Sequence, residues 1–218
     1  MVKVAVIDHG MGNLHSVAKA LEVAVPGTRV DVSADPAVIR AADRVVLPGV
    51  GAIRDVMGEI NRLELTPVIQ EAVQNQPFLA VCVGLQALMT HSDENDGVDC
   101  LNVFSGGVHA FASPLYDPLS DERLKVPHMG WNQVTQSVNH PLWRDIPQDT
   151  RFYFVHSYYV QPDSPQPIAA HSNYGHAFAA ALAKDNVFAV QFHPEKSHKM
   201  GLRLYANFIQ WDGESSAS

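Results

Sequence analysis

The sequence has few cysteines, little positive charge and no long apolar run. Its 218 residues include two cysteines, Cys82 and Cys100, too few for a disulfide framework and without the CxxC spacing of a zinc site. We therefore expect a reducing, cytoplasmic location. The pattern also argues against a membrane span or a secretion signal, since no stretch of about 18 apolar residues and no charged segment leading into an apolar run is present.

Basic residues are scarce as well. Fifteen Lys and Arg against 23 Asp and Glu give a net charge of −8, and no basic cluster occurs, so nucleic acid and anionic membranes are poor partner candidates. Eleven histidines are present, but none has a tight spacing such as His-x-x-x-His, so we predict no metal site. The length suits one domain with its own core. We assign residues 1–212 to that domain and 213–218 to a flexible C-terminal tail.

The first half of the chain alternates short apolar runs with amphipathic segments. This alternation predicts a doubly wound, mostly parallel sheet with right-handed crossovers and with its chemistry at the C-terminal ends of the strands. Asn13 and Thr66 are predicted N-caps, and Asp35-Pro36 should begin a short helix. Gly10-Met11-Gly12 lacks the third glycine of a dinucleotide fingerprint, which disfavours that function. Strands are predicted over 3–8, 29–32, 44–47 and 78–82, and helices over 14–25, 52–61 and 67–74.

The second half is richer in proline, histidine and aromatic residues. The segment 112–125 is predicted to be an exposed loop. Trp131 lies in a glycine-punctuated turn and suits either a small core or an interface. Strands are predicted over 103–108, 126–134 and 152–160, with a hairpin of 178–182 and 187–192 and a final amphipathic helix.

Cys82 ends an apolar run and precedes a helix-forming sequence. In a strand–nucleophile–helix elbow the central residue is strained, its side chain projects from the turn, and the helix N-terminus favours a thiolate. The alternative is an inert core cysteine, because free cysteine is often buried. The loop Gly49-Val50-Gly51 follows another strand and either brings backbone amides close to a ligand or forms an ordinary turn.

His193 and Glu195 have the residue types that a cysteine nucleophile requires. Such a nucleophile needs a base within hydrogen-bond reach and a group that orients the base. The two side chains stand two residues apart after a predicted strand, and Pro194 restricts the backbone between them. A His-Pro-Glu tripeptide alone is a weak signal, so the hypothesis depends on Cys82 lying nearby.

Three segments, 48–51, 78–86 and 191–197, resemble the signature segments of class I glutamine amidotransferases. Further segments over 7–14, 127–132 and 152–159 resemble the glutaminase subunits of imidazole glycerol phosphate synthases, which act in histidine biosynthesis. The resemblance spans nearly the whole chain. It implies a three-layer α/β/α, flavodoxin-like fold with additional β-structure in the second half.

The resemblance also implies roles for individual residues. Cys82 would be the nucleophile, His193 the general base and acid, and Glu195 the residue that orients His193. No cofactor is implied. Oxyanion and substrate contacts would come from Gly49, Val50, Gly51, Val83 and Gln86, and the partner interface would include Trp131, Asn132 and Lys184. The sequence departs from the family pattern at Ala80, usually glycine, and at His9, usually tyrosine.

The implied reaction is hydrolysis of L-glutamine to glutamate and ammonia through a cysteine thioester. Ammonia would pass to a (β/α)8-barrel cyclase subunit, in a heterodimer, that makes imidazole glycerol phosphate and AICAR from PRFAR. Three alternatives stay open: a paralogous glutaminase subunit for another aminated product, a stand-alone γ-glutamyl cysteine hydrolase, and a non-catalytic interaction module on the same scaffold.

Overall fold

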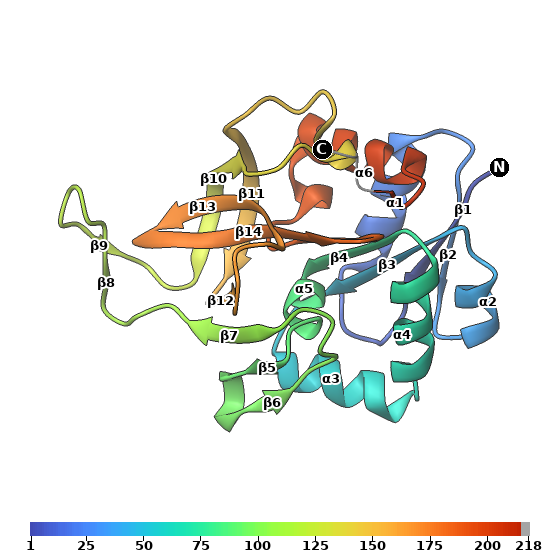
Figure 1. The fold of residues 1–218 in the computed structure, drawn as a ribbon, viewed down its shortest axis with the longest axis horizontal. Coiled ribbons are helices and arrows are strands. Elements are labelled where there is room, and N and C mark those ends of the chain that lie inside the picture. Colours follow the sequence, from blue (N-terminus) through green and yellow to red (C-terminus); the bar gives the residue numbers. More distant parts are fainter. Residues whose placement is uncertain (215–218) are drawn as a thin grey trace.

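A nine-stranded sheet runs through the protein, and the structure, a computed structural model, describes residues 1–214. Figure 1 shows the sheet between two groups of helices. Its strand order is β11-β10-β13-β14-β15-β4-β3-β1-β2. One half is parallel and comprises β1 (Lys3–Ile7), β2 (Arg29–Ser33), β3 (Arg44–Gly49), β4 (Phe78–Cys82) and β15 (Val187–Val190). The other half is antiparallel and comprises β10 (His128–Gln136), β11 (Thr150–His156), β13 (Ile168–Tyr174) and β14 (His176–Lys184).

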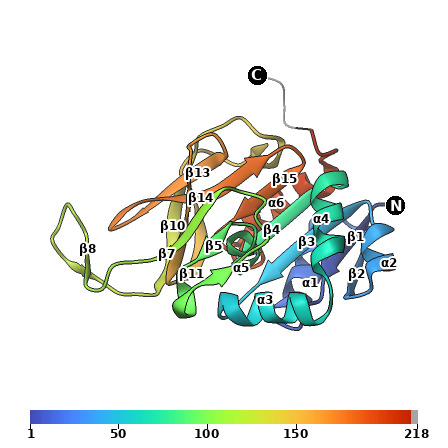
Figure 2. The same ribbon diagram turned by 60° about the horizontal axis from the view of Figure 1, so that its bottom comes forward.

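Helices cover both faces of the parallel half. α1 (Leu14–Ala24) and α6 (His198–Gln210) pack against each other on one face. α3 (Ile53–Arg62), α4 (Thr66–Asn75) and the short α5 (Val83–Ala87) lie on the other, as Figure 2 also shows, and α2 (Pro36–Arg40) packs beside α4. The three-layer α/β/α fold is therefore confirmed.

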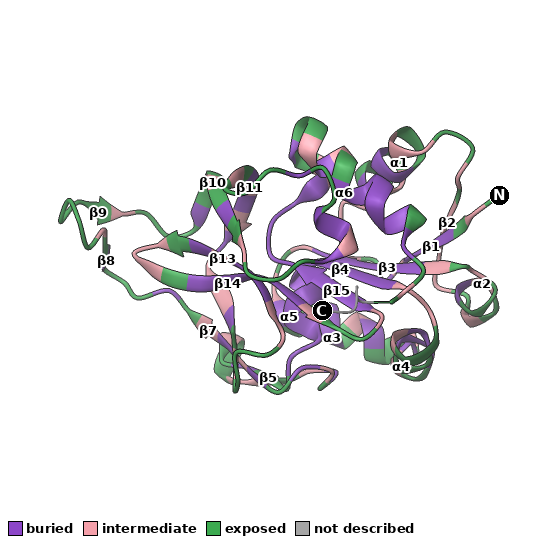
Figure 3. Cartoon of the chain, turned by 45° about the horizontal axis from the view of Figure 1, so that its top comes forward, coloured by how far each residue is buried: buried purple, intermediate pink, exposed green. Residues whose placement is uncertain are grey.

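The core follows from this layering. Every residue of β4 is buried, as are Val4 to Ile7 in β1, because helices exclude water from both faces of these strands. Figure 3 shows the resulting buried centre in purple. β14 pairs with β15 in an antiparallel hairpin, and this pairing joins the two halves into one sheet.

Smaller elements surround the antiparallel half. A second sheet contains β5 (His91–Ser92), β6 (Val98–Asp99), β7 (Gly106–Ala110) and β12 (Tyr158–Pro162). The hairpin of β8 (Leu115–Tyr116) and β9 (Arg123–Leu124) projects from the body at the left of Figure 1. Three 3-10 turns, η1 (Glu94–Asp96), η2 (Pro141–Trp143) and η3 (Pro194–Lys196), complete the elements.

Most expected elements are confirmed, with shifted ends. The segment 152–160 is two strands, β11 and β12, interrupted at Ser157, and β13 was not predicted. The segment 112–125 is not purely loop, because it carries the β8–β9 hairpin. Residues 215–218 of the predicted tail lie outside the described residues, and the single domain over 1–212 stays a prediction. No helix within residues 1–214 is long and apolar enough to cross a membrane.

One of the three predicted helix caps, Thr66, is wrong, and Asn13 occupies the N-cap position of α1 without using its side chain. Asp35 is the N-cap of α2, and its carboxylate accepts a hydrogen bond of 2.8 Å from the Ala37 amide, as predicted. Asn13 precedes α1 without a side-chain cap bond within the described residues. α4 already includes Thr66, whose hydroxyl donates instead to Asn61 Oδ1 at 3.2 Å.

Candidate active site

Cys82 occupies a strained turn between β4 and α5. Its backbone angles are φ 56° and ψ −112°, a conformation that L-residues rarely adopt. The turn requires close packing of β3 against α5. A Cβ atom on Gly84 would overlap the carbonyl oxygen of Leu47, and one on Gly49 would lie 2.8 Å from the Gly84 amide nitrogen. Glycine at both positions therefore lets the elbow form.

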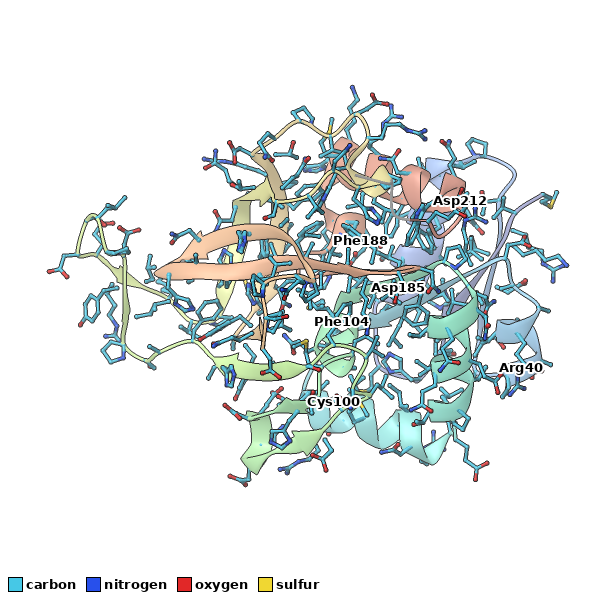
Figure 4. All side chains as sticks on the ribbon, in the orientation of Figure 1. Arg40, Cys100, Phe104, Asp185, Phe188 and Asp212 are labelled. Atoms are coloured by element: carbon cyan, nitrogen blue, oxygen red, sulfur yellow. The ribbon has the colours of Figure 1, made fainter. Side chains whose placement is uncertain are left out.

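A cavity of about 290 Å³ opens beside the Cys82 side chain. His193 lines the same cavity from just beyond the C-terminal end of the neighbouring parallel strand β15, the same end of the sheet as Cys82. The other cysteine, Cys100, lies near the second sheet (Figure 4), and burial together with the nearby Asp99 charge raises the pKa of its thiol to about 12. Cys82 is therefore the cysteine with access to a base. The cavity is also lined by Val50, Gly51, Val83, Gln86, Glu94, Pro127, Val155, His156, Ser157 and Tyr158.

The His193 imidazole is held by a carboxylate. Its Nδ1 lies 2.8 Å from Glu195 Oε1, and both side chains are almost completely buried. Burial opposes protonation, but the Cys82 sulfur and the Glu195 carboxylate outweigh it and raise the pKa of His193 to about 10. Nε2 is buried without a hydrogen-bond partner among the described residues. This atom is therefore available to a substrate in the cavity.

The strand β11 fixes the segment that carries His193. The His193 amide donates to the Tyr153 carbonyl at 2.9 Å. Ser197 Oγ donates to the His193 carbonyl at 2.6 Å and accepts from the Tyr153 amide at 3.0 Å. These three bonds hold the base on the rigid edge of the sheet.

The glycine loop lies directly beside the nucleophile. Gly49, at the end of β3, pairs with Cys82 in the parallel register, and Gly51 has φ +87°, which favours glycine. His9 is fully buried, and its Nε2 lies 2.7 Å from the Pro48 carbonyl. Burial lowers the pKa of His9, so the neutral ring donates through Nε2. The other departure, Ala80, is buried within β4.

Two polar residues near the cavity were missed by the sequence argument. Gln191 is fully buried, and its Nε2 lies 3.8 Å from Cys82 Sγ. Glu94 lines the cavity and accepts a 3.1 Å bond from the Ile53 amide. Gln191 precedes His193 by two residues, and this spacing, which places extended residues on one side, is a signal that would have found it. Glu94 has no comparable signal.

The three residues predicted at an interface do not lie together. Trp131 is 41% exposed and stacks on the His198 ring, with 5.0 Å between centroids, so it is not a core residue. Asn132 follows it on β10 and is half-buried. Lys184 pairs with Val187 at the start of β15, the end of that strand away from His193. The amine of Lys196 lies 6.0 Å from the centre of the Tyr153 ring, whose centre is also 6.0 Å from that of the Trp131 ring.

Comparisons with known proteins agree with this geometry. The family model for class-I glutamine amidotransferases matches residues 5–211, and the chain belongs to that family. It is 61% identical over 213 residues to the imidazole glycerol phosphate synthase subunit HisH 1 of Pseudomonas aeruginosa, covering 98% of this chain and 99% of the relative. The HisH subunit of Pseudomonas putida is 59% identical with the same coverage. Within the family, the chain is therefore a member of the HisH group.

Solved structures show the same fold at lower identity. PurLQS from Thermotoga maritima matches with a TM-score of 0.73 and 15% identity, over 96% of this chain and 98% of that one. A glutamine amidotransferase from Thermotoga maritima matches with a TM-score of 0.60 and 16% identity, over 93% of this chain and 80% of that one. At these identities the likeness is one of fold.

Proposed function

We propose that this protein hydrolyses L-glutamine with Cys82 as the nucleophile, His193 as general base and acid, and Glu195 as the residue that orients His193. The single observation that carries the proposal is the strained Cys82 elbow opening into the same cavity as a buried His193–Glu195 pair. An imidazolium beside the sulfur stabilises a thiolate, which is the reactive form.

The reaction would take two steps. The Cys82 thiolate attacks the side-chain amide carbon of glutamine, and His193 gives its proton to the leaving nitrogen, which departs as ammonia. His193 then takes a proton from water, and the resulting hydroxide cleaves the thioester to glutamate and thiolate. Glu195 stabilises the imidazolium and fixes the ring so that Nε2 exchanges the protons.

Substrate contacts would come from the two walls of the cavity. Backbone amides of Val83 and of Gly49, Val50 and Gly51 are the donors for the tetrahedral oxyanion, because both segments flank Cys82. Gln86 and Glu94 line the cavity and would bind the polar amino-acid end of glutamine.

We further propose that the ammonia passes to a (β/α)8-barrel cyclase subunit, which makes imidazole glycerol phosphate and AICAR from PRFAR. The relatives' names as synthase subunits support an assembly of this kind. The exposed Trp131 and its neighbour Asn132 are the interface residues we favour. Lys184 fits this surface less well, because it lies at the other end of β15. A cytoplasmic location accompanies the proposal, since a catalytic thiol must stay reduced.

A glutaminase assay with and without the cyclase and its nucleotide substrate tests the proposal. We expect low glutamine turnover alone and a large increase when both are added. Cys82→Ser should abolish glutamine-dependent synthesis but leave synthesis from added ammonium salts. Glutamine use by Cys82→Ser would overturn the mechanism, and full activity without the cyclase would favour a stand-alone hydrolase.

A further inference from the structure

Tyr205, on the last helix, places a buried hydroxyl beside the carboxylate of Glu195. The hydroxyl oxygen lies 3.4 Å from Glu195 Oε2, whereas Oε1 of the same carboxylate faces His193 Nδ1 at 2.8 Å. Tyr205 is completely buried and the Glu195 side chain is 2% exposed, so bulk water does not compete for this contact. Among the described residues, Tyr205 is the one hydrogen-bond donor to Oε2.

The helix α6 brings the Tyr205 ring to this carboxylate. Gly201 lies one turn before Tyr205 on the same side of the helix, and a Cβ atom on Gly201 would overlap the carbonyl oxygen of Pro194. Glycine at this position therefore lets α6 approach η3, the segment that carries Glu195, with its backbone almost in contact. The close approach fixes the distance between the helix and the carboxylate.

The direction of this hydrogen bond follows from the two groups. Burial and the nearby Glu195 charge raise the pKa of Tyr205 well above its usual value, so the phenol keeps its proton at pH 7. A carboxylate only accepts hydrogen bonds, so the hydroxyl donates. His193 Nδ1 and the Tyr205 hydroxyl thus face the two different oxygens of Glu195. Both contacts exist together only when the carboxylate has the rotation seen here.

We propose that Tyr205 is a positioning residue for the reaction, because its hydroxyl holds the Glu195 carboxylate in the rotation that sets Oε1 against His193 Nδ1. Without this donor Oε2 would be a buried charged oxygen with no partner, and the carboxylate would turn toward any other donor within reach. The inference rests on the proposed role of Glu195 and adds a fourth side chain behind the Cys82, His193 and Glu195 set. Tyr205 is not among the described residues that line the cavity, so we do not expect it to touch the substrate.

The first test is Tyr205→Phe, which removes the hydroxyl and keeps the ring. The glutaminase kcat, measured with the cyclase and its nucleotide substrate, should fall about fivefold while the KM for glutamine stays unchanged, because the hydroxyl acts on the base and not on substrate binding. The loss should be smaller than that for Glu195→Ala, since 3.4 Å is long for a bond between two oxygens. An unchanged kcat overturns the proposal.

A double-mutant cycle with Glu195 distinguishes positioning from a merely structural role. In Glu195→Ala the acceptor of the hydrogen bond is absent, so adding Tyr205→Phe should lower kcat no further. If Tyr205→Phe lowers kcat by the same factor in both backgrounds, the hydroxyl does not act through Glu195 and the proposal is overturned.

A measurement without the cyclase gives an independent readout. The proton on His193 Nδ1, which is hydrogen-bonded to Glu195, should give a downfield signal in the proton NMR spectrum. This signal should shift in Tyr205→Phe, because the second oxygen of the same carboxylate has lost its donor. A signal that stays in place overturns the proposal.

Phe208 supplies the matched control on the same helix. Its ring is fully buried but carries no polar group. Phe208→Leu should lower the midpoint of thermal unfolding and leave both kcat and the His193 signal unchanged. An equal loss of kcat in Phe208→Leu and Tyr205→Phe overturns the proposal, because disturbed packing of α6 would then explain both. If Glu195→Ala leaves turnover unchanged, the proposed role of Glu195 fails. If Glu195→Ala lowers kcat and Tyr205→Phe does not, only the inference about Tyr205 fails.

Discussion

The buried residues of the parallel half of the sheet are mostly aliphatic, whereas two strands of the antiparallel half, β10 and β11, bury histidines and aromatic rings. β1, β3 and β4 enclose valine, leucine and alanine side chains, and the reacting groups lie just beyond strand ends. β10 and β11 instead bury His128, Phe152, Phe154 and His156. A purely apolar core fixes the backbone, while a polar core also fixes the direction of each hydrogen bond. The parallel half therefore presents the reactive groups, and the Tyr153 backbone on β11 of the antiparallel half holds the segment that carries His193.

The largest expected effect comes from removing the base His193, which follows the parallel strand β15. His193→Ala should lower the glutaminase kcat, measured with the cyclase present, about 1,000-fold, in the range for general acid–base groups. Glu195→Ala should lower it less, about 10- to 100-fold, because an orienting residue supplements the base. An equal or larger loss in Glu195→Ala would mean that Glu195 takes part in the chemistry directly.

The second effect is a pH dependence of the free energy of unfolding, to which the two halves of the sheet contribute at different pH values. The unfolded pKa of histidine is about 6.5, and those of folded His128 and His156 are about 4 and about 3. Below pH 6.5 these two histidines bind protons in the unfolded chain but stay neutral in the folded protein. The free energy of unfolding should thus fall between about pH 6.5 and pH 4, by about 1.4 kcal/mol per pH unit for each such histidine.

The free energy of unfolding at alkaline pH should instead depend on the pair His193 and Glu195. Because the pKa of folded His193 is raised to about 10, its stabilising contribution is complete below pH 6.5 and is lost as the pH rises through about 10. Urea unfolding at pH 4.5, 6.5 and 9.5 measures both limbs. His128→Asn should reduce the fall of the unfolding free energy between pH 6.5 and pH 4.5, and His193→Gln should reduce its fall between pH 6.5 and pH 9.5. If His128→Asn changed the alkaline range and His193→Gln the acid range, the two halves would not contribute separately as stated here.

A third effect tests the tight packing of the parallel half. Gly84→Ala should lower the free energy of unfolding by about 2–3 kcal/mol, because the added methyl group overlaps the Leu47 carbonyl. Gly58 lies exposed inside α3, and, apart from its chain neighbours and the backbone of its own helix, no described atom lies within 4 Å of the place that an added methyl group would take. Gly58→Ala should therefore raise stability by about 0.5–1 kcal/mol. Thermal unfolding of both variants checks the opposite signs.

The smallest effect compares two helix starts beside the parallel strands. Asp35→Ala should cost about 1 kcal/mol, since the carboxylate accepts from the Ala37 amide. Asn13→Ala should change stability by less than about 0.5 kcal/mol, as expected for a surface change without a specific interaction. Urea denaturation distinguishes these values, and a larger loss for Asn13→Ala would show that Asn13 caps α1 in solution.

The parallel half was predictable because its signals are local. Short apolar runs read as buried strands, and the Asp35-Pro36 pair begins α2 as expected. The strained turn at Cys82 also followed from adjacent residues. The Thr66 cap failed because residue type does not settle where a helix begins or which other acceptor a hydroxyl finds, and Asn13 is the N-cap residue of α1 but its side chain makes no cap bond.

The antiparallel half was harder to predict because its pairing is non-local. β13 has no clear polar–apolar alternation, and it is stabilised by pairing with β14 through a register shift. The hairpin of β14 and β15 was predicted from local residues, but the pairing of β15 with β4, which joins this hairpin to the central sheet, depends on contacts that no local pattern reveals. Strand pairing between distant parts of the chain also places Lys184 away from Trp131, and the sequence alone does not reveal that pairing.

The candidate site likewise contains residues that could be predicted from local sequence and contacts that could not. Cys82, His193 and Glu195 could be proposed from residue type and strand ends, and the structure places them around one cavity or in direct contact with a residue that lines it. The bond from Gln191 to the sulfur and the hydrogen bond between His128 and His156 could not, since these contacts depend on side-chain directions across neighbouring strands.

The segment that carries His193 also protects an edge of the sheet. β11 is the last strand in its order, and an unpaired edge is a template for pairing with another molecule. On β11 the outward amide and carbonyl of Tyr153 are already bonded to Ser197 and His193. Ser197→Ala would therefore loosen the base and free an edge amide together. Loss of catalysis and a tendency to aggregate should arise from the same substitution.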